Sequence, residues 1–240
     1  MRKNHAMPQN AEKFLDTFNS IEKHLKSKYN NGNYLPFHDL IRRASEKEGV
    51  IKKFRKDLFT YADLRNVMVH NVRINGKIIA EPLDEVIERI EYIWTQVQHP
   101  EKVSQFKKKV YYCFSDDVLT KALQFMHEHK ISQVPILEKG VIVDVLNASH
   151  IADWLTVKKI VSSDEVIIGE LLENAGRNRN FEIISVNMSV FDAAEIYRSS
   201  FRKHPVNWYY DALVITPTGK AEEQMMGIIV LKDIAEYISM

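Results

Sequence analysis

The stretch QVPILEKGVIVDVLNASHIADWL, residues 133–155, contains two short apolar runs followed by a helical pattern. The apolar runs predict strands over 134–137 and 141–146, and the apolar positions of 151–155 predict a helix. An acidic cap and another helical pattern, over 115–126, precede the first of these strands. This alternation of helices and strands is typical of a small α/β module.

The same order of elements returns later in the chain. Residues 186–238 again read as cap, helix, strand, strand and helix. Val118 pairs with Val190 in this repeat, and Ile151 pairs with Ile234. An internal repeat of this kind predicts one β-α-β-β-α module used twice, with each half burying the sheet face of the other.

The two modules resemble a tandem pair of CBS domains, a unit that senses adenosine-containing ligands. That family usually has a proline in its second strand and a Gly-h-h-Thr-x-x-Asp signature, where h is apolar. The resemblance implies that the signature hydroxyl meets phosphate and that the carboxylate meets ribose hydroxyls. The proline stands at Pro135 in the first repeat.

The signature differs between the two repeats. In the second it reads GIIVLKD, which keeps Gly227 and Asp233 but places Val230 where the hydroxyl is expected. In the first it has changed to DVLNASH over 144–150, with Asn147 and His150 at the hydroxyl and carboxylate positions. The nucleotide-binding residues that the resemblance implies are Asp233, Val230, Gly227, His150, Asn147 and Pro135.

Three of these residues have simpler alternative roles. Asp233 also suits the cap of a final helix, and Asn147 also suits a turn. A histidine at a helix start, as at His150, is often a surface or capping residue. With the resemblance, we expect a regulatory adenine nucleotide, which is AMP, ADP, ATP or a cyclic dinucleotide. A CBS pair can also serve as a dimerisation platform.

The first hundred residues show helical periodicity. Apolar residues three and four apart predict a helix over 11–29, which a glycine-containing turn ends. A second, short helix is expected from Pro36, and a third from Val50 through Tyr61 towards residues 62–71. A last helix is expected over 82–99. An Asn-Gly pair within 72–79 predicts a β-hairpin.

The predicted fold class is therefore α plus α/β. We expect a helical bundle over 1–100 and a CBS pair over 101–240, because the periodicity changes at the end of the last predicted helix. The first repeat is expected at about 105–160 and the second at about 180–240. The polar stretch 101–109 is expected to join the two parts.

Within the helical part, ADLRNVMVHN, residues 62–71, places Arg65 and Asn66 ahead of His70. A guanidinium binds phosphate bidentately, and an imidazole transfers protons near neutral pH. The pattern resembles the Arg-x4-6-His motif of the HEPN superfamily of helical domains. That resemblance implies a metal-independent endoribonuclease, in which the ribose 2′-hydroxyl attacks the adjacent phosphate, and a site formed at the interface of a homodimer.

The resemblance also implies a role for each motif residue. His70 would transfer a proton, Arg65 would stabilise charge on the phosphate, and Asn66 would orient the pair. No metal ligand and no catalytic cofactor are assigned. The competing hypothesis is a non-catalytic adenine-nucleotide sensor whose helical domain binds RNA or a protein partner.

Charge is unevenly distributed along the chain. Residues 1–80 carry a formal charge of +8 and residues 81–240 carry −7, so the net charge is +1. Positive potential near the Arg-His motif favours a polyanion such as RNA. One cysteine, Cys113, excludes an internal disulfide, and no apolar run reaches membrane-spanning length. We therefore expect a soluble, cytoplasmic protein without a membrane partner.

Overall fold

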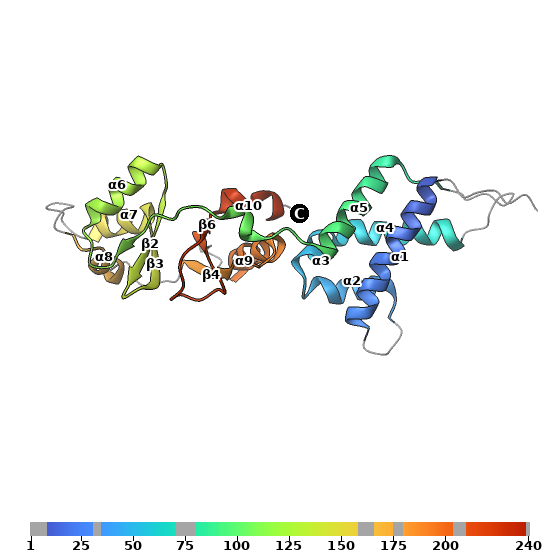
Figure 1. Ribbon diagram of the computed structural model, residues 1–240, viewed down its shortest axis with the longest axis horizontal. Coiled ribbons are helices and arrows are strands. Elements are labelled where there is room, and N and C mark those ends of the chain that lie inside the picture. The colour runs from blue at the N-terminus through green and yellow to red at the C-terminus, as the bar shows by residue number, and fades with distance from the viewer. Residues whose placement is uncertain are drawn as a thin grey trace, which may run out of the picture. The chain divides into compact units, whose positions relative to one another are not determined.

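The computed structural model describes residues 9–30, 35–70, 80–157, 166–174, 180–203 and 210–238 (Figure 1). The chain divides into one compact unit that ends at Glu101 and another that begins at Lys102. The hairpin predicted over 72–79 lies outside the described residues, as does the side chain of His70. In the part of the chain that the structure describes, no helix has the length and apolar character of a membrane span.

The first unit is helical. Its helices are α1 (Gln9–Tyr29), α2 (Phe37–Ser45), α3 (Gly49–Lys53), α4 (Arg55–His70) and α5 (Asp84–Gln98). Helix α1 contacts α2, α4 and α5, and its apolar stripe of Phe14, Phe18, Ile21 and Leu25 is buried. Helical periodicity predicted this stripe, because residues three and four apart share one face of a helix.

The helix expected to run from Val50 into the motif is broken at Phe54 into α3 and α4. Phe54 has backbone angles φ −95° and ψ 13°, which lie outside the helical range. Its ring is buried, packs edge-on against Tyr92 at 5.9 Å between centroids, and lies 5.0 Å from the Arg89 guanidinium. The break therefore coincides with a buried contact to α5, which the local sequence pattern does not reveal.

The second unit contains two three-stranded sheets with helices around them. The first sheet and its helices are β1 (Cys113–Phe114), α6 (Leu119–His129), β2 (Gln133–Glu138), β3 (Val141–Asn147) and α7 (Ala148–Val157). The second set is β4 (Phe181–Ser185), α9 (Val190–Lys203), β5 (Ala212–Thr216), β6 (Gly227–Ile229) and α10 (Leu231–Ile238). In each sheet the first strand pairs parallel with the second, and the third pairs antiparallel with it.

The strand pairing also aligns the two repeats residue by residue. Val134 pairs with Leu146 in the first sheet, and Leu213 pairs with Ile229 in the second. The short strands β1 and β4 and the helix α8 (Ile168–Asn174) had no clear sequence signal. β1 is only two residues long and α8 is only seven, so both are shorter than the stretch over which a periodic pattern can be recognised.

The polar stretch 101–109, expected to be a linker, instead packs on the second repeat. It contains the 3-10 turn η1 (Val103–Phe106), in which Val103 is fully buried. The Val103 N–H donates to the Met188 carbonyl at 2.9 Å, and the Lys108 N–H donates to the Met226 carbonyl at 3.0 Å. These backbone bonds join residues too distant in sequence for pattern reasoning to connect, so the sequence did not reveal that this joining stretch packs on the second repeat.

A reciprocal contact is made by α8, which directly precedes the second repeat in sequence. Ile168, Leu171 and Leu172 belong to the buried cluster of the first repeat, together with Cys113 and Trp154. Ahead of the helix, the Val166 carbonyl accepts a hydrogen bond from Leu119 N–H at 2.8 Å. Each repeat is therefore completed by the segment that precedes the other repeat.

The contact between the η1 segment and the second repeat is closest at Gly227. A Cβ at Gly227 would lie 2.6 Å from the Phe106 carbonyl oxygen and 3.1 Å from Ile215 Cδ1. Because the oxygen belongs to the backbone, a side chain there would require the η1 segment to shift. The glycine at the first signature position thus has a structural reason that is independent of any ligand.

We expect Gly227→Ala to reduce the free energy of unfolding by about 1–3 kcal/mol, the usual cost of overpacking. Gly169→Ala is the graded comparison, since a Cβ there would lie 3.1 Å from the Ser115 carbonyl oxygen. Urea unfolding of the two variants should rank Gly227→Ala as the more destabilised. Stability of Gly227→Ala equal to wild type would mean that η1 does not press on β6.

Candidate functional site

The second unit contains a cavity of about 570 Å³ that both repeats line. The first repeat contributes the segment before β1, the end of α6 and the start of β2. The second contributes the residue ahead of β5 and the passage from β6 into α10. The lining residues are Lys108, Lys109, Val110, Tyr111, His129, Lys130, Ile131, Ser132, Gln133, Pro135, Asp211, Ile228, Val230, Leu231, Lys232 and Asp233.

Three of the six predicted nucleotide-binding residues line this cavity: Pro135, Val230 and Asp233. Pro135 is buried within β2 and pairs with Val145 of β3. Val230 is the residue before α10 and presents only an aliphatic side chain, so the hydroxyl of the family signature has no equivalent here. Any phosphate in the cavity must therefore be held by other groups.

Asp233 lies in the first turn of α10. Its Oδ2 accepts a hydrogen bond from the Val230 N–H at 3.0 Å, which is the reciprocal half of a capping box. The Lys108 Nζ lies 3.8 Å from the same oxygen. An ionised carboxylate has about four acceptor sites, so this cap leaves Asp233 able to accept hydrogen bonds from a ligand.

Tyr197 of α9 supports the end of β6 that leads to Asp233. It is fully buried and donates its hydroxyl to the Ile229 carbonyl at 2.9 Å. Burial, with the nearby charges of Asp233 and Asp211, raises the pKa of Tyr197. The hydroxyl therefore stays protonated and keeps its role as a donor at physiological pH.

Aromatic and apolar groups form another part of the cavity wall. The rings of Tyr111 and His129 stack with centroids 3.6 Å apart and planes 16° apart. The Lys109 Nζ lies 5.1 Å from the Tyr111 ring centroid, within cation–π range. Ile131 and Ile228 add aliphatic surface. A planar base has suitable partners for stacking and apolar contact here.

Asn147 and Asp211 are joined in a polar network at the sheet ends. The Asn147 side-chain amide donates to Asp211 Oδ2, and the Asn180 amide donates to the same oxygen at 2.6 Å. Asn147 Oδ1 also accepts from the His150 N–H at 2.8 Å, which caps α7. The turn role that the sequence left open for Asn147 is thus present in the structure.

The other three predicted nucleotide-site residues, Asn147, His150 and Gly227, are not among the residues that line the cavity. The Nδ1 of His150, in α7, is buried without a hydrogen-bond partner among the described residues. Gly227 lies under the η1 segment, as described above. Sequence reasoning missed Lys130 and the pair Lys108 and Lys109, because these two segments share no motif. Lys232 could have been found from the sequence, since it stands next to Asp233 in the signature.

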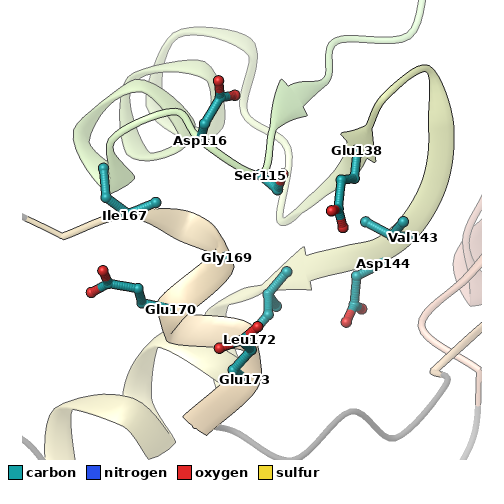
Figure 2. A pocket seen from close by; sticks show the side chains of 10 residues that line it. All are labelled: Ser115, Asp116, Glu138, Val143, Asp144, Ile167, Gly169, Glu170, Leu172 and Glu173. Atoms are coloured by element: carbon teal, nitrogen blue, oxygen red, sulfur yellow. The ribbon is translucent and has the colours of Figure 1, made fainter.

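A smaller pocket, of about 270 Å³, lies within the first repeat. Figure 2 shows Glu170 and Glu173 on α8, Asp116 after β1, Glu138 at the end of β2 and Asp144 on β3 around it. All of its charged lining residues are acidic, so its electrostatics disfavour a phosphate. Within the described residues, no group of three His, Cys, Asp or Glu side chains is placed to hold a metal ion.

The predicted catalytic residues of the first unit lie on α4. The Arg65 Nη1 donates to Asn66 Oδ1 at 3.4 Å, and Asn66 is exposed. His70 is the last residue of α4, and its side chain lies outside the described part of the chain. At 3.6 residues per turn, Asn66 and His70 share a face, whereas Arg65 is rotated about 140° from His70.

A second histidine lies beside α4 that the sequence analysis did not single out. His38 of α2 has its Nε2 3.5 Å from Asp63 Oδ1, and its ring stacks on Phe59 with centroids 5.1 Å apart. Arg42, one turn further along α2, lies 5.8 Å from the same Phe59 ring. No linear motif connects His38 with the Arg65 region, because the two helices meet only in the fold.

Comparison with known proteins identifies a CBS domain at residues 103–157, where the CBS domain family model matches. A comparison with curated protein sequences gives no match. The matched segment runs from η1 through α7, so it includes the first repeat and the turn that packs on the second.

The solved structures that resemble the chain include proteins with CBS domains. A signal-transduction protein from Burkholderia ambifaria MC40-6 is 15% identical, with 57% of this chain and 90% of that chain covered and a TM-score of 0.41. CBSX2 in complex with AMP is 14% identical, with 57% and 94% covered and a TM-score of 0.40. The CBS domain of a bacterial CNNM/CorC family Mg²⁺ transporter in complex with ATP is 20% identical, with 65% and 97% covered and a TM-score of 0.43.

We expect Asn147→Asp to destabilise the second unit by about 1–3 kcal/mol at neutral pH. The new carboxylate keeps the α7 cap but replaces the donor to Asp211 by a like charge. The loss should shrink as the pH falls into the carboxyl range, since protonation restores a donor. Chemical unfolding at several pH values measures this.

The control for that variant is Asn187→Asp, because Asn187 is exposed in a turn. It adds the same charge without touching the network and should change stability by no more than about 0.5 kcal/mol. An Asn147→Asp protein as stable as wild type would show that the bond to Asp211 contributes nothing.

Proposed function

We propose that the second unit senses an adenine-nucleotide-type ligand bound in the cavity lined by both repeats. The observation that carries this proposal is the meeting, in one cavity of about 570 Å³, of a carboxylate, an aromatic and aliphatic wall, and several lysines. Ligand cavities of this size, about 300–1,000 Å³, are usual for small molecules. The CBS domain at residues 103–157 supports the proposal, since the family resemblance implies adenosine-containing ligands.

Each part of a nucleotide has a matching group in the wall. The base packs against Ile131, Pro135 and Ile228, and the ribose hydroxyls donate to Asp233. The phosphate end lies among the lysines. The ligand would contact both repeats at once, so binding would stabilise one arrangement of the two relative to others. We propose that this change in the arrangement of the repeats regulates the first unit.

Replacing Asp233 by Asn tests the ribose contact. The amide oxygen can still accept from the Val230 N–H, so α10 keeps its cap. We expect the affinity for ATP, measured by isothermal titration calorimetry, to fall about tenfold or more, because a charge-assisted hydrogen bond is lost. Thermal unfolding without ligand should stay close to wild type.

Glu236→Gln is the matched control, since it neutralises an exposed carboxylate of the same helix. It should leave ATP affinity unchanged. Equal affinities for wild type and Asp233→Asn would remove Asp233 from the site. Failure of the wild-type protein to bind AMP, ADP, ATP or a cyclic dinucleotide would end the sensor proposal.

For the first unit, we propose a metal-independent endoribonuclease with Arg65, Asn66 and His70 as its residues. The support is that all three lie near the end of one helix, with Arg65 and Asn66 in contact. The excess of basic residues in the first 80 positions favours a polyanionic substrate. The alternative is a non-catalytic unit that binds RNA or a protein partner.

The chemistry requires RNA, because the internal nucleophile is the ribose 2′-hydroxyl. His70 takes the proton of this hydroxyl or supplies one to the leaving 5′-oxygen, and the P–O5′ bond breaks as the 2′,3′-cyclic phosphate forms. Arg65 stabilises the charge that develops on the phosphate. In the proposed homodimer, both copies of the motif face one groove, so two guanidinium groups would converge.

We expect His70→Ala to reduce cleavage of labelled single-stranded RNA in EDTA by about two to four orders of magnitude, the usual contribution of proton transfer. RNA affinity, measured by fluorescence anisotropy, should change little, since it depends mainly on Lys and Arg. Arg65→Ala should reduce both.

His127→Ala serves as the control, because His127 is an exposed histidine of the second unit. Unchanged cleavage by His70→Ala would assign the activity to another site or a contaminant. Absence of EDTA-resistant cleavage by wild type, with and without nucleotide, would favour the non-catalytic alternative. A monomer in sedimentation velocity at micromolar concentration would contradict the homodimer.

A further inference from the structure

The cavity wall contains more ammonium groups than carboxylates. Four lysines and two aspartates line the cavity, which leaves a formal balance of +2 before any ligand enters. Lys108 lies 3.8 Å from Asp233 and is partly neutralised by it. Lys109, Lys130 and Lys232 remain as ammonium groups from three different segments of the chain around one cavity.

The residue that the family signature offers to phosphate is not available. Val230 has no hydroxyl, and its N–H already donates to Asp233. The lysines therefore supply the positive groups that a phosphate in this cavity can meet. Ammonium groups attract phosphate as point charges, and several of them suit a chain of phosphates better than a single one.

Lys130 adopts a backbone conformation that a lysine rarely takes. It is the C-cap of α6, with φ 53° and ψ 41°, in the left-handed region where glycine is preferred. Glycine would end the helix with less strain but would bring no charge to the cavity wall. Lys139 also has a positive φ, of 51°, but it lies in the turn between β2 and β3 and is not part of the cavity wall.

We propose that this cavity selects nucleotides that carry two or more linked phosphates, and that Lys130, together with Lys109 and Lys232, binds the phosphate chain. The inference rests on the proposed nucleotide sensor and specifies its ligand class. Asp233 binds the ribose hydroxyls, and the lysines make the affinity depend on the number of phosphates. A monophosphate fills only part of the positive wall and binds more weakly.

Calorimetric titration of the full chain with AMP, ADP and ATP tests the selectivity. ADP and ATP are expected to bind at least about tenfold more tightly than AMP, because each added phosphate gains a charge-assisted contact. The difference should narrow as salt rises, since partly exposed charges are screened. Inorganic triphosphate alone should bind more weakly than ATP, because it lacks base and ribose.

The possible results distinguish the phosphate selectivity from the nucleotide-sensor proposal on which it rests. AMP and ATP affinities within twofold of each other would overturn the phosphate selectivity and leave the nucleotide sensor standing. A cyclic dinucleotide that binds more tightly than ATP would also overturn it. Failure of every nucleotide to bind would overturn both. If inorganic triphosphate bound as tightly as ATP, the base and ribose would contribute nothing to affinity. That result would contradict a nucleotide ligand.

Lys130→Gly and Lys139→Gly form a matched pair of variants. Both replace a left-handed lysine by glycine, so both should keep or raise the thermal unfolding temperature. Lys130→Gly is expected to lower ATP affinity about tenfold and AMP affinity much less. Lys139→Gly should change neither. Full ATP affinity in Lys130→Gly, or an equal loss in both variants, would overturn the role of Lys130.

Discussion

The close approach of the η1 segment to β6 is the contact on which the second unit depends. The Phe106 carbonyl oxygen lies only 2.6 Å from the position that a Cβ of residue 227 would take. Backbone hydrogen bonds from Val103 and Lys108 attach the same segment to the second repeat on both sides of Phe106. Because α8 makes the reciprocal contact with the first repeat, neither repeat is complete alone. The exchange also carries Lys108 and the residues after it into the cavity wall.

The side chains that line the cavity are brought together more by the packing of η1 and α8 on the opposite repeats than by the family signature. Pro135 comes from one repeat and Asp233 from the other, and the segment between η1 and β1 closes the wall with Lys109 and Tyr111. Residues 99–106 separate that segment from α5, the last helix of the first unit.

Two pockets of the second unit differ in charge, and the two repeats differ in signature. The cavity lined by both contains four lysines, whereas the pocket of the first repeat contains five carboxylates. At the end of β3, the Asn147–Asp211–Asn180 network joins the sheets with hydrogen bonds. Asn147 thus occupies a signature position but acts as a cap and a bridge, which is why an altered motif is compatible with an intact fold.

The local periodicity of the sequence predicted many of the helices and strands of this protein. The stripe of α1, the strands β2 and β3 and the internal repeat follow from spacing, because burial of one face imposes a period on the sequence. The family resemblance also singled out Asp233, Val230 and Pro135, which line one cavity in the structure. Only the tertiary structure decided the rest: the packing of η1 on the other repeat, the break at Phe54, and the meeting of lysines from separate segments. These features depend on contacts between residues far apart in the chain, and such contacts leave no periodic trace in the sequence.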